Sequence, residues 1–92
     1  MRHRVRPKHL AAKLRAVRKH LGLSQSQLAA RLSFDVENGR ISDYELGKRT
    51  PNVLILLDYA RLGGIHIDDL VDDEIDLTQF RDALVTKKSE SR

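Results

Sequence analysis

Apolar residues recur at helical spacing along most of the chain and predict a series of short helices. The first predicted helix spans residues 8–21 and is followed by Gly22, a residue type that commonly ends helices in the left-handed conformation. Its apolar residues are spaced by four, three and four positions, which places them on one helix face. They are Leu10, Leu14, Val17 and Leu21.

The second predicted helix, residues 25–32, carries a start signal that the sequence alone reveals. Ser24 is a candidate N-cap, and Gln27 can return a hydrogen bond to the Ser24 backbone, so the two residues predict a capping box. Leu23 before the cap and Leu28 at the fourth helical position are placed to form a hydrophobic staple. We therefore expect this helix to begin immediately after the cap.

Three further helices are predicted before residue 72. They span residues 38–46, 53–62 and 66–71. Gly47 ends the first of them, Asn52 caps the second, and Gly63 ends the second. The expected inward-facing residues are Ile41, Tyr44 and Leu46, then Val53, Leu54, Leu56, Leu57 and Ala60, then Ile67, Leu70 and Val71. Five consecutive helical patterns predict an all-α fold.

A C-terminal extension, residues 72–92, follows the five predicted helices. Apolar residues alternate with acids over residues 72–78, which predicts an extended segment or a strand. A last helix is predicted for residues 78–85, with Phe80 and Leu84 on its apolar side. The extension either folds back on its own domain or provides a dimer seam or a partner site, and the sequence favours neither alternative.

The charge is distributed unevenly along a chain whose net charge is +4. Residues 1–34 contain nine Lys and Arg and no acid, whereas residues 68–76 contain six acids and no base. A basic end is typical of nucleic-acid binders, although a solvated basic helix has the same composition. Residues 1–7 are expected to form a flexible basic arm, which either reaches a phosphate or a minor groove or is a simple tail. Its arginines are Arg2, Arg4 and Arg6.

The sequence offers little that is typical of an enzyme, a metal site or a membrane protein. It contains no Cys, and its four His residues show no metal-ligand spacing. The acidic run at residues 68–76 lacks the glycine and terminal Glu of an EF-hand loop, so we interpret it as solvated charge. There is no catalytic combination, no secretion signal and no apolar run of about 20 residues. With 92 residues, we expect a single cytoplasmic domain that is not an enzyme and needs no cofactor.

The segment from Leu23 to Pro51 resembles the helix-turn-helix of the phage repressor and Cro type, also called XRE-like. That family pattern reads roughly L-S-Q-x-x-L-A-x-x-L, a short turn, I-S-x-x-E-x-G-x-x-x-P and then an apolar helix. The matching residues are Leu23, Ser24, Gln25, Leu28, Ala29, Leu32, Ile41, Ser42, Glu45, Gly47 and Pro51. The turn is longer here than in the commonest family form. Either Asn38 and Gly39 form a turn, or Asn38 is the N-cap of the second motif helix with Gly39 and Arg40 in its first turn.

The resemblance implies roles for individual residues. The second motif helix would be the recognition helix, whose N-terminal residues meet base edges in the major groove. The candidate base-reading residues are Asn38, Arg40, Ser42 and Asp43. Arg and Asn can bind guanine and adenine in bidentate fashion, while Asp43 could accept from cytosine or simply orient Arg40. The candidate phosphate-contacting residues are Gln25, Lys48, Arg49 and Thr50. Arg18 and Glu45 are implied to form a structural ion pair.

The resemblance therefore implies a five-helix, repressor-like DNA-binding domain over residues 8–71. Its expected function is sequence-specific binding of double-stranded DNA by a small transcriptional regulator of repressor type, commonly as a homodimer. The alternative is an antitoxin-like or adaptor protein that binds a partner protein through residues 72–92. A nucleoid-type structural protein is disfavoured, because the motif is specific.

Overall fold

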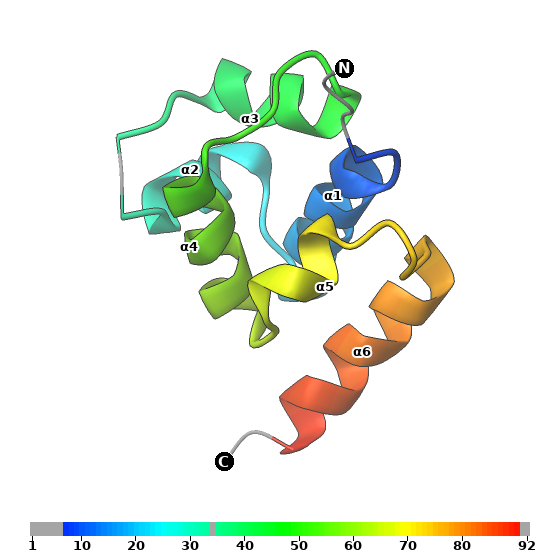
Figure 1. Ribbon diagram of the computed structural model, residues 1–92. Coiled ribbons are helices and arrows are strands. Elements are labelled where there is room, and N and C mark those ends of the chain that lie inside the picture. Colours follow the sequence, from blue (N-terminus) through cyan, green and yellow to red (C-terminus); the bar gives the residue numbers. More distant parts are fainter. Residues whose placement is uncertain (1–6, 34, 91–92) are drawn as a thin grey trace, which may run out of the picture.

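The computed structural model describes residues 7–33 and 35–90, without the side chains of Asn38 and residues 87–90. Every regular element in this part of the chain is an α-helix (Figure 1). The helices are α1 (Leu10–Leu21), α2 (Gln25–Arg31), α3 (Asn38–Leu46), α4 (Val53–Gly63), α5 (Ile67–Val71) and α6 (Leu77–Glu90). The predicted all-α fold is confirmed. The arginines of the predicted arm, in residues 1–6, lie outside the described residues.

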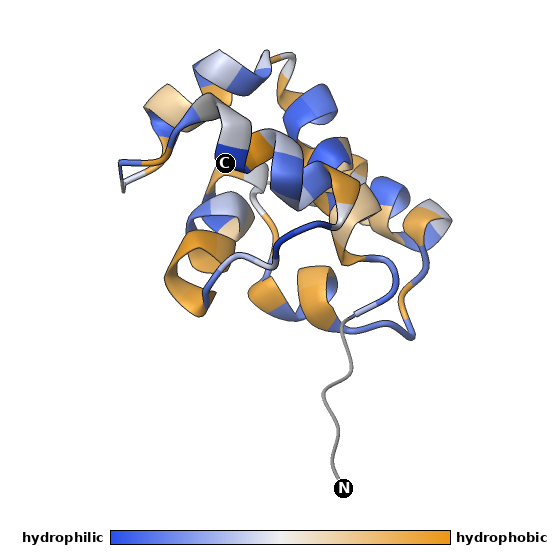
Figure 2. Cartoon of the chain, turned by 90° about the horizontal axis from the view of Figure 1, so that it is seen from above, coloured by the Kyte–Doolittle hydropathy of each residue, from blue (hydrophilic) through white to orange (hydrophobic). Residues whose placement is uncertain are grey.

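Helix α1 lies at the centre of the packing. It contacts α3, α4, α5 and α6, while α2 packs against α3 and α4 against α5 (Figure 1). Leu14 and Val17 of α1 are fully buried, as are Leu28, Ile41 and Tyr59 from α2, α3 and α4. Most helices carry both hydrophilic and hydrophobic colours in Figure 2, as expected for helices with one buried side. The predicted apolar faces thus meet in one core.

Local sequence signals set several helix boundaries. The Ser24 side chain accepts a hydrogen bond from Gln27 N at 3.1 Å, and Gln27 Oε1 accepts one from Ser24 N at 2.8 Å, so the predicted capping box forms. Helices α1 and α3 end at Gly22 and Gly47, whose φ angles of 71° and 77° suit glycine. Asn52 caps α4 with its side-chain oxygen.

Four residues that were predicted to face inward are exposed, so these predictions are wrong. They are Leu46, Val53, Leu54 and Val71, with exposed fractions of 65%, 64%, 52% and 39%. The first is the last residue of α3, and the next two form the start of α4. Helical period identifies residues near the buried face, but the neighbouring elements decide how wide the covered face is.

Residues 72–76 form turns between α5 and α6, so the predicted extended segment or strand is wrong. Within the described ranges there is no strand. Asp76 Oδ1 accepts from Gln79 N and Gln79 Oε1 accepts from Asp76 N, both at 2.9 Å, which satisfies amide groups at the start of α6. The alternation of acids with apolar residues therefore reflects helix capping rather than strand pairing.

The same acidic segment also fixes the start of α1, which begins at Leu10 rather than at residue 8. Asp73 Oδ2 accepts from Lys8 N at 2.8 Å and Asp73 Oδ1 from His9 N at 3.2 Å. The bond from Lys8 does most to lower the pKa of Asp73; burial opposes the shift, and the bond from His9 adds to it. The interpretation of this acidic run as solvated charge is therefore wrong for Asp73 and Asp76.

Helix α6 folds back on α1 and completes the core. Phe80 is fully buried and Leu84 is nearly so. Lys13 of α1 is also fully buried, with its Nζ atom 5.5 Å from the centre of the Phe80 ring. It donates to the backbone oxygens of Asp69 and Asp72, at 2.9 Å each, around the C-terminal end of α5. Burial lowers the pKa of Lys13, and nearby carboxylates oppose the shift. The apolar side of the C-terminal extension is thus used within the chain.

Candidate nucleic-acid interface

A buried carboxylate on α4 holds the connection between α2 and α3 in place. Asp58 of α4 accepts from Ser33 N at 2.7 Å and from Ser33 Oγ at 3.0 Å. Because 25 residues separate the two in the chain, no local pattern in the sequence announces this contact. The longer connection ends at Glu37, the N-cap of α3, so Asn38 is the first residue of the helix rather than its cap.

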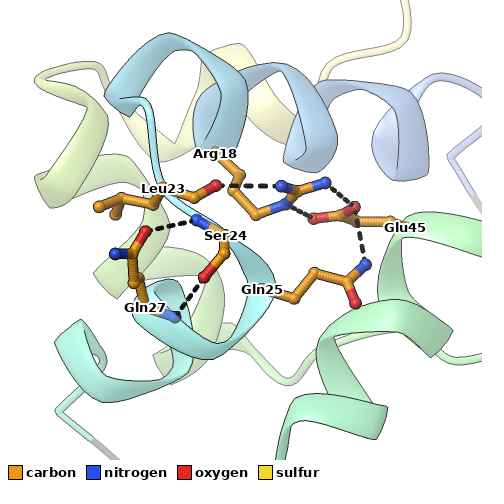
Figure 3. Close-up of polar contacts among 6 residues, drawn as sticks. All are labelled: Arg18, Leu23, Ser24, Gln25, Gln27 and Glu45. Atoms are coloured by element: carbon orange, nitrogen blue, oxygen red, sulfur yellow. Dashed lines mark hydrogen bonds and ion pairs between the residues drawn. The ribbon is translucent and has the colours of Figure 1, made fainter.

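Arg18 and Glu45 form the ion pair that the resemblance implies, and it joins three elements (Figure 3). Arg18 Nε lies 2.7 Å from Glu45 Oε2, and Arg18 Nη2 lies 2.9 Å from Glu45 Oε1. Arg18 Nη1 also donates to the Leu23 oxygen at 3.0 Å. The side chains are only 13% and 5% exposed. The hydrogen bond to Glu45 raises the pKa of Arg18, against a smaller opposing effect of burial.

Gln25, a predicted phosphate-contacting residue, joins this network. Its Nε2 atom donates to Glu45 Oε1 at 3.3 Å (Figure 3), and its side chain is half-buried. Gln25 and Ser42 line a hollow of about 280 Å³ between α1, α2 and α3. The first residue of α2 is therefore fixed relative to the last turn of α3. The ion pair and the two neutral groups bonded to it, the Gln25 amide and the Leu23 oxygen, link α1, the α1–α2 turn, α2 and α3.

The predicted base-reading residues occupy different sides of α3. Ser42 faces the hollow beside α1 and α2, whereas Arg40 lines a hollow of about 310 Å³ with Asp35, Glu37 and Asn52. The helical rotation of 100° per residue puts Asp43 between these two sides. The side chain of Asn38 lies outside the description.

Arg40 and the neighbouring Gly39 are both exposed. Among the described ion pairs none includes Arg40, and a Cβ added at Gly39 would meet no atom within 4 Å. Asp43 instead pairs with Arg49, at 3.1 Å between Oδ2 and Nε, so the idea that Asp43 orients Arg40 is wrong. The first turn of α3 thus presents an unpaired cation and bare backbone to solvent.

The basic turn after α3 is closed onto the end of the helix. Lys48 N and Arg49 N both donate to the Asp43 oxygen, at 2.9 Å and 3.3 Å. The Lys48, Arg49 and Thr50 side chains are exposed, while Pro51 is buried. Arg49 is partly engaged with Asp43 through an exposed ion pair. Backbone hydrogen bonds therefore hold Lys48 and Arg49 beside the end of α3, and Thr50 follows directly.

Other kinds of site find little support in the part of the chain that the structure describes. None of its helices has the length and apolar character needed to cross a membrane. Within the same residues, no three His, Cys, Asp or Glu side chains are grouped to hold a metal ion.

Comparison with known proteins agrees with the geometry of this surface. A helix-turn-helix family profile matches residues 14–70, more than half of the chain, and covers α2, the connection and α3. No characterised protein and no solved structure matches the chain. The match includes the repressor-type pattern from Leu23 to Pro51 and the Arg18–Glu45 pair that braces it. The chain belongs to the XRE-like helix-turn-helix family of DNA-binding regulators.

Proposed function

We propose that this protein is a small transcriptional regulator of repressor type, which binds a specific duplex sequence and blocks access to it. Helix α3 enters the major groove with its N-terminal half toward the base edges. The observation that carries the proposal is the braced α2–α3 unit, which presents the unpaired Arg40 near its start and exposed cations just after its end. Such a unit combines base contacts with phosphate contacts in one rigid body.

Base reading falls to Asn38, Arg40, Ser42 and Asp43. Arg40 suits guanine, because a guanidinium can bind O6 and N7 together, and Asn38 suits adenine. Asp43 is already bonded to Arg49, so it acts at a base edge only by exchanging or sharing that partner. Arg40 is therefore the residue on which we expect base preference to depend most.

Phosphate contacts fall to Gln25, Lys48, Arg49 and Thr50. These contacts position the protein without reading sequence and make binding dependent on salt. The basic arm could add to them, since Pro7 and Lys8 line a hollow of about 230 Å³ together with Arg49 and Thr50. Pro7 and Lys8, which follow the arginines of the predicted arm, thus lie beside the basic turn.

The experiment that tests this function is selection of bound duplexes from a random pool at fixed, near-physiological salt. We expect enrichment of a two-fold symmetric sequence with half-sites roughly 10 bp apart, as for a homodimer. Failure to enrich any sequence, with only salt-sensitive binding, would refute sequence-specific recognition.

Two variants, measured on the selected duplex, distinguish base contacts from phosphate contacts. Arg40→Ala should relax preference at one base pair by about 1–3 kcal/mol, whereas Lys48→Ala should weaken binding to all sequences equally and reduce the salt slope by about 1. Arg61→Ala, at an exposed position near the end of α4, is the control and should change neither. Identical behaviour of the Arg40 and Lys48 variants would contradict the division.

The adaptor alternative retains one feature in its favour. Phe80 and Leu84 are used inside the chain, so a partner that binds residues 72–92 would meet the outer side of α6. That side borders a groove between α6 and α1.

A further inference from the structure

A groove runs between the second half of α1 and the middle of α6, apart from the residues assigned to DNA. Its volume is about 610 Å³, which falls within the ~300–1,000 Å³ typical of binding sites. It is lined by Arg15, Ala16, Lys19 and His20 from α1 and by Arg81, Leu84 and Val85 from α6. We call it the α1–α6 groove.

The rim of the α1–α6 groove carries positive charge that the rest of the described chain leaves uncompensated. Arg15, Lys19 and Arg81 are exposed, and none of them takes part in an ion pair between described residues. Helix α1 itself contains no acidic residue. His20 adds a buried Nε2 atom with no hydrogen-bond partner within the described part. An anionic ligand would relieve the mutual repulsion of these cations.

The floor of the groove is apolar. Leu84 is 2% exposed and covers the base, while Val85 beside it remains 59% exposed. A nucleic-acid phosphate backbone would use only the cations of this groove. An amphipathic helix would use both the apolar floor and the charged rim, so the groove suits such a helix better. In Figure 1, α6 also runs away from α3 toward the opposite end of the molecule.

We propose that the α1–α6 groove binds an acidic amphipathic segment of a partner protein. Carboxylates of that segment meet Arg15, Lys19 and Arg81, and its apolar side covers Leu84 and Val85. The groove contains none of the residues assigned to base reading or phosphate contact, although Arg15 also lines the hollow that holds Gln25 and Ser42. Because Lys19, Arg81 and Val85 do not line that hollow, the partner and DNA bind at the same time. The surface therefore gives this DNA-binding domain a second, protein-directed activity.

The test uses the full chain and a displayed library of random peptides about 16 residues long, enough for roughly four helical turns. Peptides are selected on the wild-type protein and counter-selected on the Arg81→Glu variant. We expect enrichment of sequences with Asp or Glu on one helical face and Leu, Ile or Phe on the other. Enrichment of uncharged or basic peptides, or of none, would overturn the proposal.

A labelled copy of the most enriched peptide then measures affinities by fluorescence anisotropy. Arg81→Glu turns an attraction for the peptide's carboxylates into a repulsion, and Val85→Asn removes an apolar contact, so each should weaken binding about tenfold. Arg61→Glu makes the same charge change at an exposed site on α4 and should weaken it less than about twofold. Both changed groove residues are exposed, so folding is retained and is checked by circular dichroism.

Two further results would count against the proposal. If Arg61→Glu weakens the peptide as much as Arg81→Glu, the attraction is a general effect of net charge and the groove is not a site. If Arg81→Glu lowers affinity for the selected duplex as much as Lys48→Ala does, the rim is an extension of the DNA surface. The proposal requires duplex affinity to stay within about twofold of wild type in the Arg81 variant.

Discussion

Replacing Glu45 by alanine should destabilise the domain far more than the loss of a surface ion pair would. The Glu45 side chain is 5% exposed and receives two charged hydrogen bonds from Arg18, at 2.7 Å and 2.9 Å. In the variant, the Arg18 side chain remains 13% exposed and keeps only the Leu23 oxygen as a hydrogen-bond partner among the described residues. A nearly buried charge that has lost its counter-ion is costly.

The expected loss is about 3 kcal/mol in the free energy of unfolding, the lower end of the ~3–5 kcal/mol range for broken buried pairs, because Arg18 keeps some contact with water. Small domains have only about 5–15 kcal/mol in total. At about 4–8 °C per kcal/mol for a domain of this size, the Tm should fall by roughly 12–24 °C.

The assay is urea unfolding of the wild type, Arg18→Ala, Glu45→Ala and the double variant. The coupling energy between the two positions should be about 2 kcal/mol, because removing both partners leaves no orphaned charge. The internal control is the same cycle on Arg49 and Asp43, whose side chains are 55% and 33% exposed. That pair should couple by about 0–1 kcal/mol.

The reasoning fails if Glu45→Ala costs less than about 1 kcal/mol, or if its coupling to Arg18 is no larger than in the exposed pair. Burial would then not govern the strength of this contact, and the α1–α2–α3 unit would owe its rigidity to apolar packing alone.

Three other changes test separate features of the fold. Gly39→Ala should stabilise α3 by about 0.5–1 kcal/mol, because the new Cβ meets open space. The same methyl group should lower DNA affinity, because it adds bulk to the surface proposed to face the DNA. Equal or higher affinity would show that Gly39 does not lie in the interface. Asp73→Asn should lower the Tm at neutral pH. The bond from Lys8 lowers the pKa of Asp73 in the folded protein. The stabilisation by the Asp73 carboxylate is therefore fully present above pH 3.8, the ordinary pKa of Asp, and is lost as pH falls through the lower folded pKa. If the Tm difference between wild type and Asp73→Asn persists below that folded pKa, this reasoning is wrong. Phe80→Ala should cost about 3–5 kcal/mol in urea unfolding, since its fully buried ring joins α6 to α1, and a small cost would mean that α6 is dispensable.

Features that depend on nearest neighbours in the chain were predicted well. The Ser24–Gln27 capping box forms as expected, and α3 spans Asn38–Leu46, the range that the sequence predicts. The Arg18–Glu45 contact was implied by the family pattern alone, because nothing local connects residues 27 positions apart. The roles of the predicted DNA-contacting residues stay predictions.

Contacts between distant segments were missed. Asp58 holds the connection to the recognition helix through Ser33, and Asp73 caps α1 from the α5–α6 turn. In the sequence, Asp73 is one of several neighbouring acids and Asp58 is a single acid in an apolar helix, and neither position indicates its partner. A carboxylate becomes a cap only when folding brings unsatisfied amide groups within reach.

The sequence by itself determined the start of α2, the ends of α1 and α3, the main apolar faces and the membership of a DNA-binding family, since capping, glycine conformation and helical period act over a few residues. Only the tertiary structure decided that Leu46 and Val53 stay exposed, that Lys13 is buried and that α6 closes over α1. Lys13 shows the reason most clearly. A lysine is normally a surface residue, and it is buried here because two backbone oxygens and an aromatic ring, at least 56 residues away in the chain, meet its ammonium group.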